Sequence, residues 1–262
     1  MSILLIIPTL LGWVAGWIVN YLSDVLPVTR RFSQPTCPEC NASYSPKEYL
    51  LFQRCANGHS RGIRPWIVQI ALVAVTIYVW LQPPTKLGFA LSFLLLIYFA
   101  VVIVIDMEHR LILHPTSIVG AVLAFALGFL SHGLVPTLLG GLAGFLIMMA
   151  FYLLGVLFTR MRIKRLEANG QQNDDEEALG AGDVILVTIL GFLVGWPLIW
   201  FMILFSILLG GIVSFLLVVV LLITRKYEKN ALMMFIPYGP YFVISAFLMV
   251  FFPRFLALLV PG

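Results

Sequence analysis

Long apolar runs dominate the sequence, and the polar residues gather between them. A helix that spans a membrane needs roughly 20 mostly apolar residues, because its backbone groups must find their hydrogen-bond partners within the helix. Apolar stretches of this kind lie near residues 3–22, 66–82, 87–105, 116–131, 134–158, 184–196, 198–223 and 234–259. The pattern therefore predicts an all-α, polytopic membrane protein of about eight transmembrane helices.

Turn residues support these divisions. The apolar run from Val184 to Ile223 is long enough for two spans, and Gly195-Trp196-Pro197 is a natural turn between them. Pro115 suits the first turn of a helix, where its missing N–H is not needed. We therefore expect one helix to begin near residue 115 and another near residue 198.

The composition excludes several classes of protein. Hydrophobic residues make up 61% of the 262 residues and charged residues only 11%, against about 25% charged in ordinary globular proteins. This excludes a disordered chain, a nucleic-acid-binding protein and a typical soluble enzyme. Continuous apolar runs also favour helices over the alternating strands of a membrane barrel. The expected surroundings of the chain are a lipid bilayer.

The basic residues predict an orientation. Only Lys86 and Arg254 fall on one side of the predicted spans, whereas the other 14 of the 16 Lys and Arg residues fall on the opposite side. Those 14 lie in the loops 23–65, 106–115, 159–183 and 224–233. Since loops rich in Lys and Arg stay in the cytoplasm, we expect these loops to be cytoplasmic and both termini to lie outside.

All 12 acidic residues also fall on the predicted cytoplasmic side. Asp24 follows the first predicted helix, which suggests an interfacial charge. The run 173–177 suggests a solvated linker. Glu108, His109 and His114 either tune a nearby acid or are interfacial polar residues.

Two aspartates stand out because they occur at predicted helix ends. Asp106 ends the apolar run 100–105, at a helix C-terminus, where an acid opposes the helix dipole. Asp183 follows Gly180-Ala181-Gly182 and begins a helix, where an N-cap role is the simple alternative. The charge map places both acids at the same membrane face, and ionisable residues at membrane depth are candidates for function.

The two aspartates together suggest acid–base chemistry. Two carboxylates that share one water do not both ionise easily, so one holds a proton while the other acts as a base. Gly180 and Gly182 would let the backbone approach an extended substrate closely. A cation transporter or channel that uses the same aspartates is the alternative from another class.

Five features of the sequence resemble one known family. They are Gly16-Trp17-Ile18-Val19-Asn20, Cys37-Pro38-Glu39-Cys40, Ile105-Asp106, Gly180-Ala181-Gly182-Asp183 and Ile236-Pro237-Tyr238-Gly239-Pro240-Tyr241. In this order, and with eight spans, they resemble the bacterial type IV prepilin peptidases, membrane aspartic proteases of the G-x-G-D type. The resemblance implies a domain of residues 1–86, with a cysteine-rich loop near 23–65, and a peptidase domain of residues 87–262.

The resemblance also implies an activity. Members of this family sit in the bacterial cytoplasmic (inner) membrane and cleave the short basic leader of prepilin or pseudopilin precursors at its cytoplasmic face. By this resemblance Asp106 and Asp183 activate water and protonate the leaving amine, with no cofactor needed for proteolysis. Many members then methylate the new amino terminus with S-adenosylmethionine.

The chain departs from the family pattern at positions that concern methylation. Val184 and Ile185 follow the second aspartate where a lysine is common, and the chain has Asp24-Val25-Leu26-Pro27 where the family often carries an arginine before Leu-Pro. Gln69 stands where a glutamate often enters the second helix. A protease without methyltransferase activity therefore stays open as an alternative.

The cysteine loop predicts a metal site. Cys37, Cys40, Cys55 and His59 follow the pattern C-x2-C-x14-C-x3-H, which is plausible spacing for a tetrahedral Cys3His zinc site. The alternative is three reduced thiols with an unrelated surface histidine. The zinc would be structural, because so polar a loop has too little apolar content to fold alone.

Overall fold

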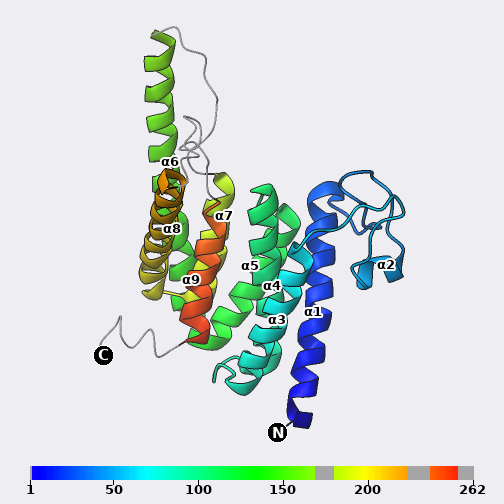
Figure 1. The fold of residues 1–262 in the computed structure, drawn as a ribbon. Coiled ribbons are helices and arrows are strands. Elements are labelled where there is room, and N and C mark those ends of the chain that lie inside the picture. Colours follow the sequence, from blue (N-terminus) through cyan, green and yellow to red (C-terminus); the bar gives the residue numbers. More distant parts are fainter. Residues whose placement is uncertain (1, 169–179, 224–236, 253–262) are drawn as a thin grey trace. The chain divides into compact units, whose positions relative to one another are not determined.

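The computed structural model describes residues 2–168, 180–223 and 237–252, and helices dominate these ranges (Figure 1). The helices are α1 (Ser2–Thr29), α2 (Pro46–Leu50), α3 (Arg64–Leu81), α4 (Gly88–His109), α5 (His114–His132), α6 (Leu134–Ala168), α7 (Ala181–Val194), α8 (Leu198–Ile223) and α9 (Gly239–Phe251). Within the described ranges there is no strand, only an isolated bridge between Thr36 and Ser43. The predicted all-α fold is therefore confirmed, with one helix for each predicted span and α2 in addition.

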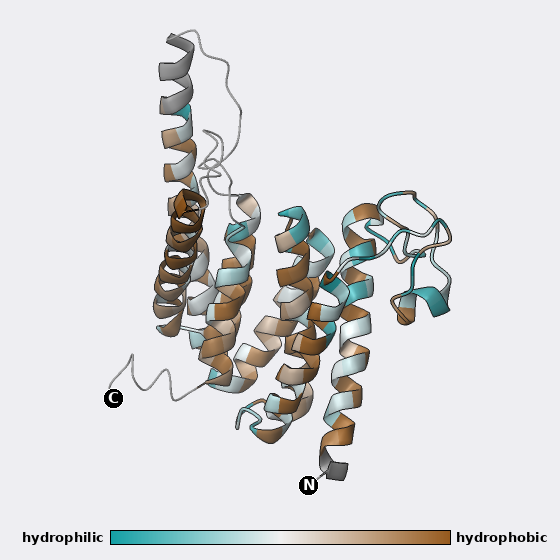
Figure 2. Ribbon diagram, in the orientation of Figure 1, coloured by the Kyte–Doolittle hydropathy of each residue, from teal (hydrophilic) through white to brown (hydrophobic). Residues whose placement is uncertain are grey.

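Six of these helices, α1, α3, α4, α5, α6 and α8, are long and apolar enough to cross a membrane. The other two apolar helices are shorter, with 14 residues in α7 and 13 in α9. Figure 2 shows hydrophobic residues on each of these long or short apolar helices. The predicted acidic linker 173–177 and the whole predicted loop 224–233 lie outside the described residues.

The first helix is longer than its apolar run predicts. It was expected to end near residue 22 but continues to Thr29, so Asp24 lies within α1 and does not follow it. The extra turns are held by packing, because Val25 and Leu26 are buried. The Thr29 hydroxyl also donates to the carbonyl of Val25. Burial of these apolar side chains thus stabilises the last turns of α1, although polar residues such as Asp24 lie there too.

The chain forms two compact units, residues 1–119 and 120–262, which divide within α5. In the first unit α1, α3 and α4 contact one another (Figure 1). They share a core that includes Ala15, Val19, Leu72, Val101 and Ile105. The cysteine-rich insert, residues 30–63, connects α1 to α3 and contains α2. The sequence-based domain boundary at residue 86 remains a prediction.

Small residues bring α1 and α3 into close contact. A Cβ on Gly12 would lie 2.7 Å from the Cα of Val73, and a Cβ on Gly16 would meet the Gln69 side chain at 2.4 Å. Close backbone approach at small residues is a common way to pack helices in membranes. The glycines of α1 therefore set how closely α3 packs against it.

The second unit is built around α7. This helix contacts α6, α8 and α9, and 8 of its residues are buried. The backbones of α6 and α7 touch, because a Cβ on Gly140 would lie only 2.4 Å from the carbonyl oxygen of Gly191. By contrast α8 exposes many large apolar side chains, among them Trp200, Leu204 and Leu208. Protein thus surrounds α7, while α8 presents the apolar surface expected of a lipid-facing helix.

The contact between α6 and α7 makes a prediction about stability. Gly140→Ala should lower the thermal unfolding temperature in detergent, since overpacking of this kind costs about 1–3 kcal/mol. Gly155→Ala, in the same helix, is the matched control, because a Cβ there meets nothing within 4 Å. Circular dichroism during heating measures both, and a Gly140→Ala protein as stable as the wild type would contradict the close packing.

Candidate active site and metal centre

A tight turn presents the first two cysteines of the insert. The Asn41 N–H donates to the Cys37 carbonyl at 2.8 Å, and the Cys37 N–H donates to the Ala42 carbonyl at 2.9 Å. Asn41 has a φ of 56°, a left-handed conformation that asparagine tolerates better than most residues. The turn directs both thiols to the same side.

A second turn presents the remaining two residues of the pattern. The Gly58 N–H donates to the Cys55 carbonyl at 2.8 Å, and the Cys55 N–H donates to the His59 carbonyl at 3.0 Å. Gly58 has a φ of 86°, which a glycine adopts without strain. The spacing C-x3-H is therefore the length of one closed turn, and this turn brings His59 back beside Cys55.

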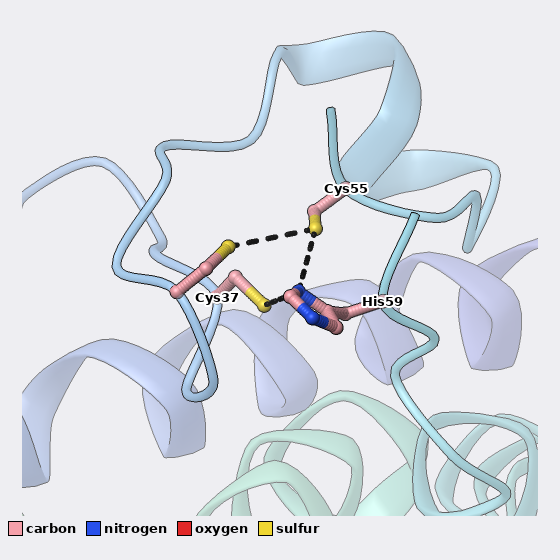
Figure 3. Close-up of side chains that lie close together, drawn as sticks. Cys37, Cys55 and His59 are labelled. Carbon is pink, nitrogen blue, oxygen red and sulfur yellow. Dashed lines mark hydrogen bonds between the residues drawn. The ribbon is translucent and has the colours of Figure 1, made fainter. Parts of the chain in front are cut away.

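The two turns face each other and bring four ligand atoms together. The three cysteine Sγ atoms and one ring nitrogen of His59 lie within 4.8 Å of one another, and Figure 3 shows Cys37, Cys55 and His59 pointing toward one another. The Sγ atoms of Cys40 and Cys55 are 3.7 Å apart, and Cys55 Sγ lies 3.6 Å from His59 Nδ1. Tetrahedral zinc with ordinary bond lengths would separate such atoms by about 3.8 Å and about 3.6 Å, respectively.

The geometry therefore fits a tetrahedral zinc ion. The predicted proximity of Cys37, Cys40, Cys55 and His59 is confirmed, and these residues could bind a metal. The alternative of an unrelated surface histidine is wrong, because His59 Nδ1 also lies 4.0 Å from Cys37 Sγ. The three cysteines are free thiols.

Glu39, a residue to which the sequence pattern gave no role, orients the histidine ring. Its Oε2 lies 3.4 Å from His59 Nε2, so the carboxylate holds the ring nitrogen that faces away from the thiols. Histidine ligands commonly have such a carboxylate behind them, which fixes the ring orientation. The sequence feature that could have indicated this role is the position of Glu39 between two ligand residues, in Cys37-Pro38-Glu39-Cys40.

The electrostatics of the turn favour thiolates at two positions. The backbone N–H of Ala42, together with His59, lowers the pKa of the Cys40 thiol to about 6. Burial opposes ionisation of Cys37, but the N–H groups of Glu39 and Cys40 outweigh it and lower the Cys37 pKa. Burial raises the pKa of Cys55. Because metals bind the thiolate form, the lowered pKa values of Cys37 and Cys40 favour binding of a cation at this turn.

Asp106 lies in the last turn of α4 and is buried, with 5% of its surface exposed. Its carbonyl accepts a hydrogen bond from the N–H of Arg110, which ends the helix in the left-handed conformation. The preceding residue, Ile105, belongs to the core of the first unit. The backbone that carries the Asp106 carboxylate is therefore held by packing on one side and by a helix cap on the other.

Asp183 lies in the first turn of α7, but it is not the N-cap. Gly180 occupies that position, and the Asp183 N–H donates to the Gly180 carbonyl at 3.0 Å. The capping alternative is therefore wrong. The Asp183 side chain is half-buried, Gly180 is exposed, and a Cβ on Gly180 would have ordinary contacts only. The proposed approach of substrate to Gly180 and Gly182 remains a prediction.

The two aspartates belong to different compact units, Asp106 to the first and Asp183 to the second. Their pairing as a dyad stays a prediction. In the second unit, the sequence motif Tyr238-Gly239-Pro240-Tyr241 lies at the start of α9, a helix that contacts α7. A Cβ on Gly210 of α8 would lie 3.1 Å from the Tyr238 ring, so this motif packs where α8 and α9 meet.

Asp24 is more than the interfacial charge that the sequence suggested. Its carboxylate accepts hydrogen bonds from Tyr49, Arg61 and Arg64, and Arg64 also contacts Glu108. We call these five residues the Asp24 network. It lies entirely within the first unit and joins α1, the cysteine-rich insert, α3 and α4. Burial of Tyr49 and its contact with the Asp24 carboxylate raise the pKa of the Tyr49 hydroxyl, which stays protonated and donates.

Comparison with known proteins identifies one family. The type IV leader peptidase family matches residues 93–215, a range that runs from α4 into α8 and contains both Asp106 and Asp183. The cysteine-rich insert lies before this range. Searches of curated proteins and of solved structures found no match.

The metal site makes a prediction about composition. Purified protein should carry about one zinc per chain, and Cys37→Ser or His59→Ala should lose it, because each change removes one of four ligands. His109→Ala is the matched control, since His109 is exposed at the end of α4. Elemental analysis measures the metal, and a folded wild-type preparation without metal would rule out the site.

Proposed function

We propose that this chain, whose residues 93–215 match the type IV leader peptidase family, is a membrane aspartic endopeptidase of that family. Its substrates would be prepilin or pseudopilin precursors, cut at the short basic leader that precedes their apolar helix. The observation that carries the proposal is the match itself, which contains Asp106 in the last turn of α4 and Asp183 in the first turn of α7.

In the proposed reaction the two carboxylates share the proton transfers. The ionised carboxylate takes a proton from a water molecule, whose oxygen attacks the scissile carbonyl. The protonated carboxyl then gives its proton to the leaving amine as the C–N bond breaks.

The charge distribution supports the proposed location. The sequence assigns 14 of the 16 basic residues to the same predicted side as both aspartates. We therefore propose that the site faces the cytoplasm of a bacterial inner membrane and that both termini lie outside. A precursor leader awaiting export lies on that side. Six helices of sufficient length and apolarity agree with a multi-pass membrane protein.

Zinc, when bound by Cys37, Cys40, Cys55 and His59, would supply a crosslink that folds the insert. The proteolytic step uses none of these residues. The insert has a small core of its own, in which Cys37 and Cys55 pack with Tyr44 and Tyr49. We therefore propose a structural metal, separate from the peptidase chemistry.

We propose proteolysis without methyl transfer. Gln69, which stands where the resembled family often has glutamate, is completely buried and packs against Gly16. Its amide donates to the Trp13 carbonyl. These contacts give Gln69 a packing role between α3 and α1. The transporter alternative has less support, since a helix broken at mid-membrane is expected at a transport site, whereas Asp106 and Asp183 lie at the ends of α4 and α7.

The proteolytic mechanism predicts that Asp106→Asn and Asp183→Asn each abolish leader cleavage while membrane insertion stays normal, because neither amide can exchange the required protons. Asp174→Asn, from the acidic run between α6 and α7, is the matched control and should cleave normally. Gel shift of a purified pilin-type precursor measures the activity. Cleavage by either of the first two variants at the wild-type rate would refute the dyad.

A second assay separates the two activities of the family. We expect cleaved substrate to incorporate no labelled methyl group from S-adenosylmethionine, because Gln69 replaces a carboxylate and no lysine follows Asp183 closely. Mass spectrometry of the new amino terminus measures this. A reaction without the protein is the control. One methyl group per new amino terminus, seen only when the protein is present, would show that methyl transfer is retained.

A further inference from the structure

We propose that Asp24, Arg64 and Glu108 form a chain of ion pairs that holds the last turn of α4, and with it Asp106, in its working position. Through these ion pairs, the cysteine-rich insert and α1 would help to hold the catalytic aspartate in place. The inference rests on the proposed function, because the position of Asp106 matters only if Asp106 acts on substrate. Arg64 and Glu108 would be positioning residues.

The chain of ion pairs starts at Asp24, whose two carboxylate oxygens both accept hydrogen bonds. Its Oδ1 accepts a hydrogen bond from Nη2 of Arg64, at the start of α3. Its Oδ2 accepts one from Nη2 of Arg61 at 2.6 Å and another from the Tyr49 hydroxyl. A single carboxylate of α1 therefore joins the insert to the beginning of α3, through charge-assisted hydrogen bonds.

Arg61 connects this carboxylate to the metal-binding part of the insert. Its guanidinium lies 3.9 Å from the centre of the Tyr49 ring and donates to the Tyr49 carbonyl at 3.0 Å. Only 6% of the Arg61 side chain is exposed. Tyr49 in turn packs in the small core with Cys37 and Cys55. The fold around the predicted zinc site thus determines where Arg61 and Asp24 meet.

Arg64 carries the connection to α4. While Nη2 binds Asp24, Nη1 donates to Oε2 of Glu108 at 2.7 Å. The planar guanidinium has a fixed fork of donors, so the position of Asp24 determines where the second donor points. Glu108 lies two residues after Asp106 in the last turn of α4. A displacement of Glu108 would therefore displace Asp106.

The last turn of α4 benefits from such a tether. Asp106 is buried, but Met107, His109 and Arg110 are exposed, and exposed helix ends open locally at low free-energy cost. Isolated ion pairs of this exposure contribute little to overall stability. The ion pairs are therefore expected to fix the position of this one turn, and not to raise the free energy of unfolding of the whole fold.

The decisive variants are Arg64→Gln and Glu108→Gln. With a pilin-type precursor in detergent, each should lower kcat roughly ten- to a hundredfold, the size of effect that a misplacement of about 1 Å causes, and leave KM within about twofold. The double variant should be no worse than the poorer single variant, because both changes break one connection. Arg54→Gln is the matched control, an exposed arginine of the same insert, and should keep wild-type kcat.

A readout besides activity tests the position of the turn itself. Amide hydrogen exchange in a peptide covering residues 104–112 should be faster in Arg64→Gln, Glu108→Gln and Asp24→Asn than in the wild type. It should be unchanged in Arg54→Gln. Zinc content equal to the wild type would show that the insert remains folded in the three network variants.

The outcomes distinguish this inference from the proposed function. If the wild type cleaves the precursor and both Gln variants match its kcat, or if exchange in residues 104–112 is unaltered, the positioning role is wrong and the peptidase proposal stands. If the wild type fails to cleave, the peptidase proposal and the positioning role both fail. The exchange measurement then still decides whether the ion pairs tether α4.

Discussion

Lipid offers no hydrogen-bond partners to a backbone, and this constraint determines where the chain can place its polar chemistry. Every apolar segment must close its own hydrogen bonds as a helix, so charged side chains are confined to helix ends and to the connections between helices. Asp24, Arg64, Asp106 and Asp183 all obey this rule, since each lies in the first or last turns of an apolar helix. The same constraint that makes charge scarce also makes the few charged residues informative.

Within the units, close helix packing gives these residues a rigid support. Backbones that touch at Gly140 and Gly191 leave α7 little freedom to shift along α6. Because α7 is also covered by α8 and α9, its first turn offers Asp183 a defined position on an otherwise buried helix. In the first unit Ile105 gives Asp106 a comparable support from the core.

The cysteine-rich insert depends on different forces. Its core of Cys37, Tyr44, Tyr49 and Cys55 is too small to fold the segment by apolar burial alone. The buried guanidinium of Arg61 adds to this small core, and a metal bound by the four residues that could hold one would add a crosslink. Since Arg61 and Arg64 share the Asp24 carboxylate, the forces that fold the insert also act on the helices beneath it.

The sequence by itself determined the features that depend on local pattern. Apolar runs located the helices, because lipid imposes one solution on each run. The spacing of Cys37, Cys40, Cys55 and His59 located a cluster that could bind a metal, because it matches two closed turns. The positions of Asp106 and Asp183 at helix ends followed from the same runs. The end of α1 could not be predicted this way, since it depends on what Val25 and Leu26 pack against.

Only the tertiary structure decided which residues are partners. Glu39 behind His59, and Asp24 between Arg61 and Arg64, join positions whose separations in the chain follow no periodic rule. The contact of Arg64 with Glu108 joins residues 44 positions apart. An isolated charge in a sequence looks the same whether it faces water or a partner. The partner is set by helix packing, which brings distant residues together through the summed contacts of many side chains.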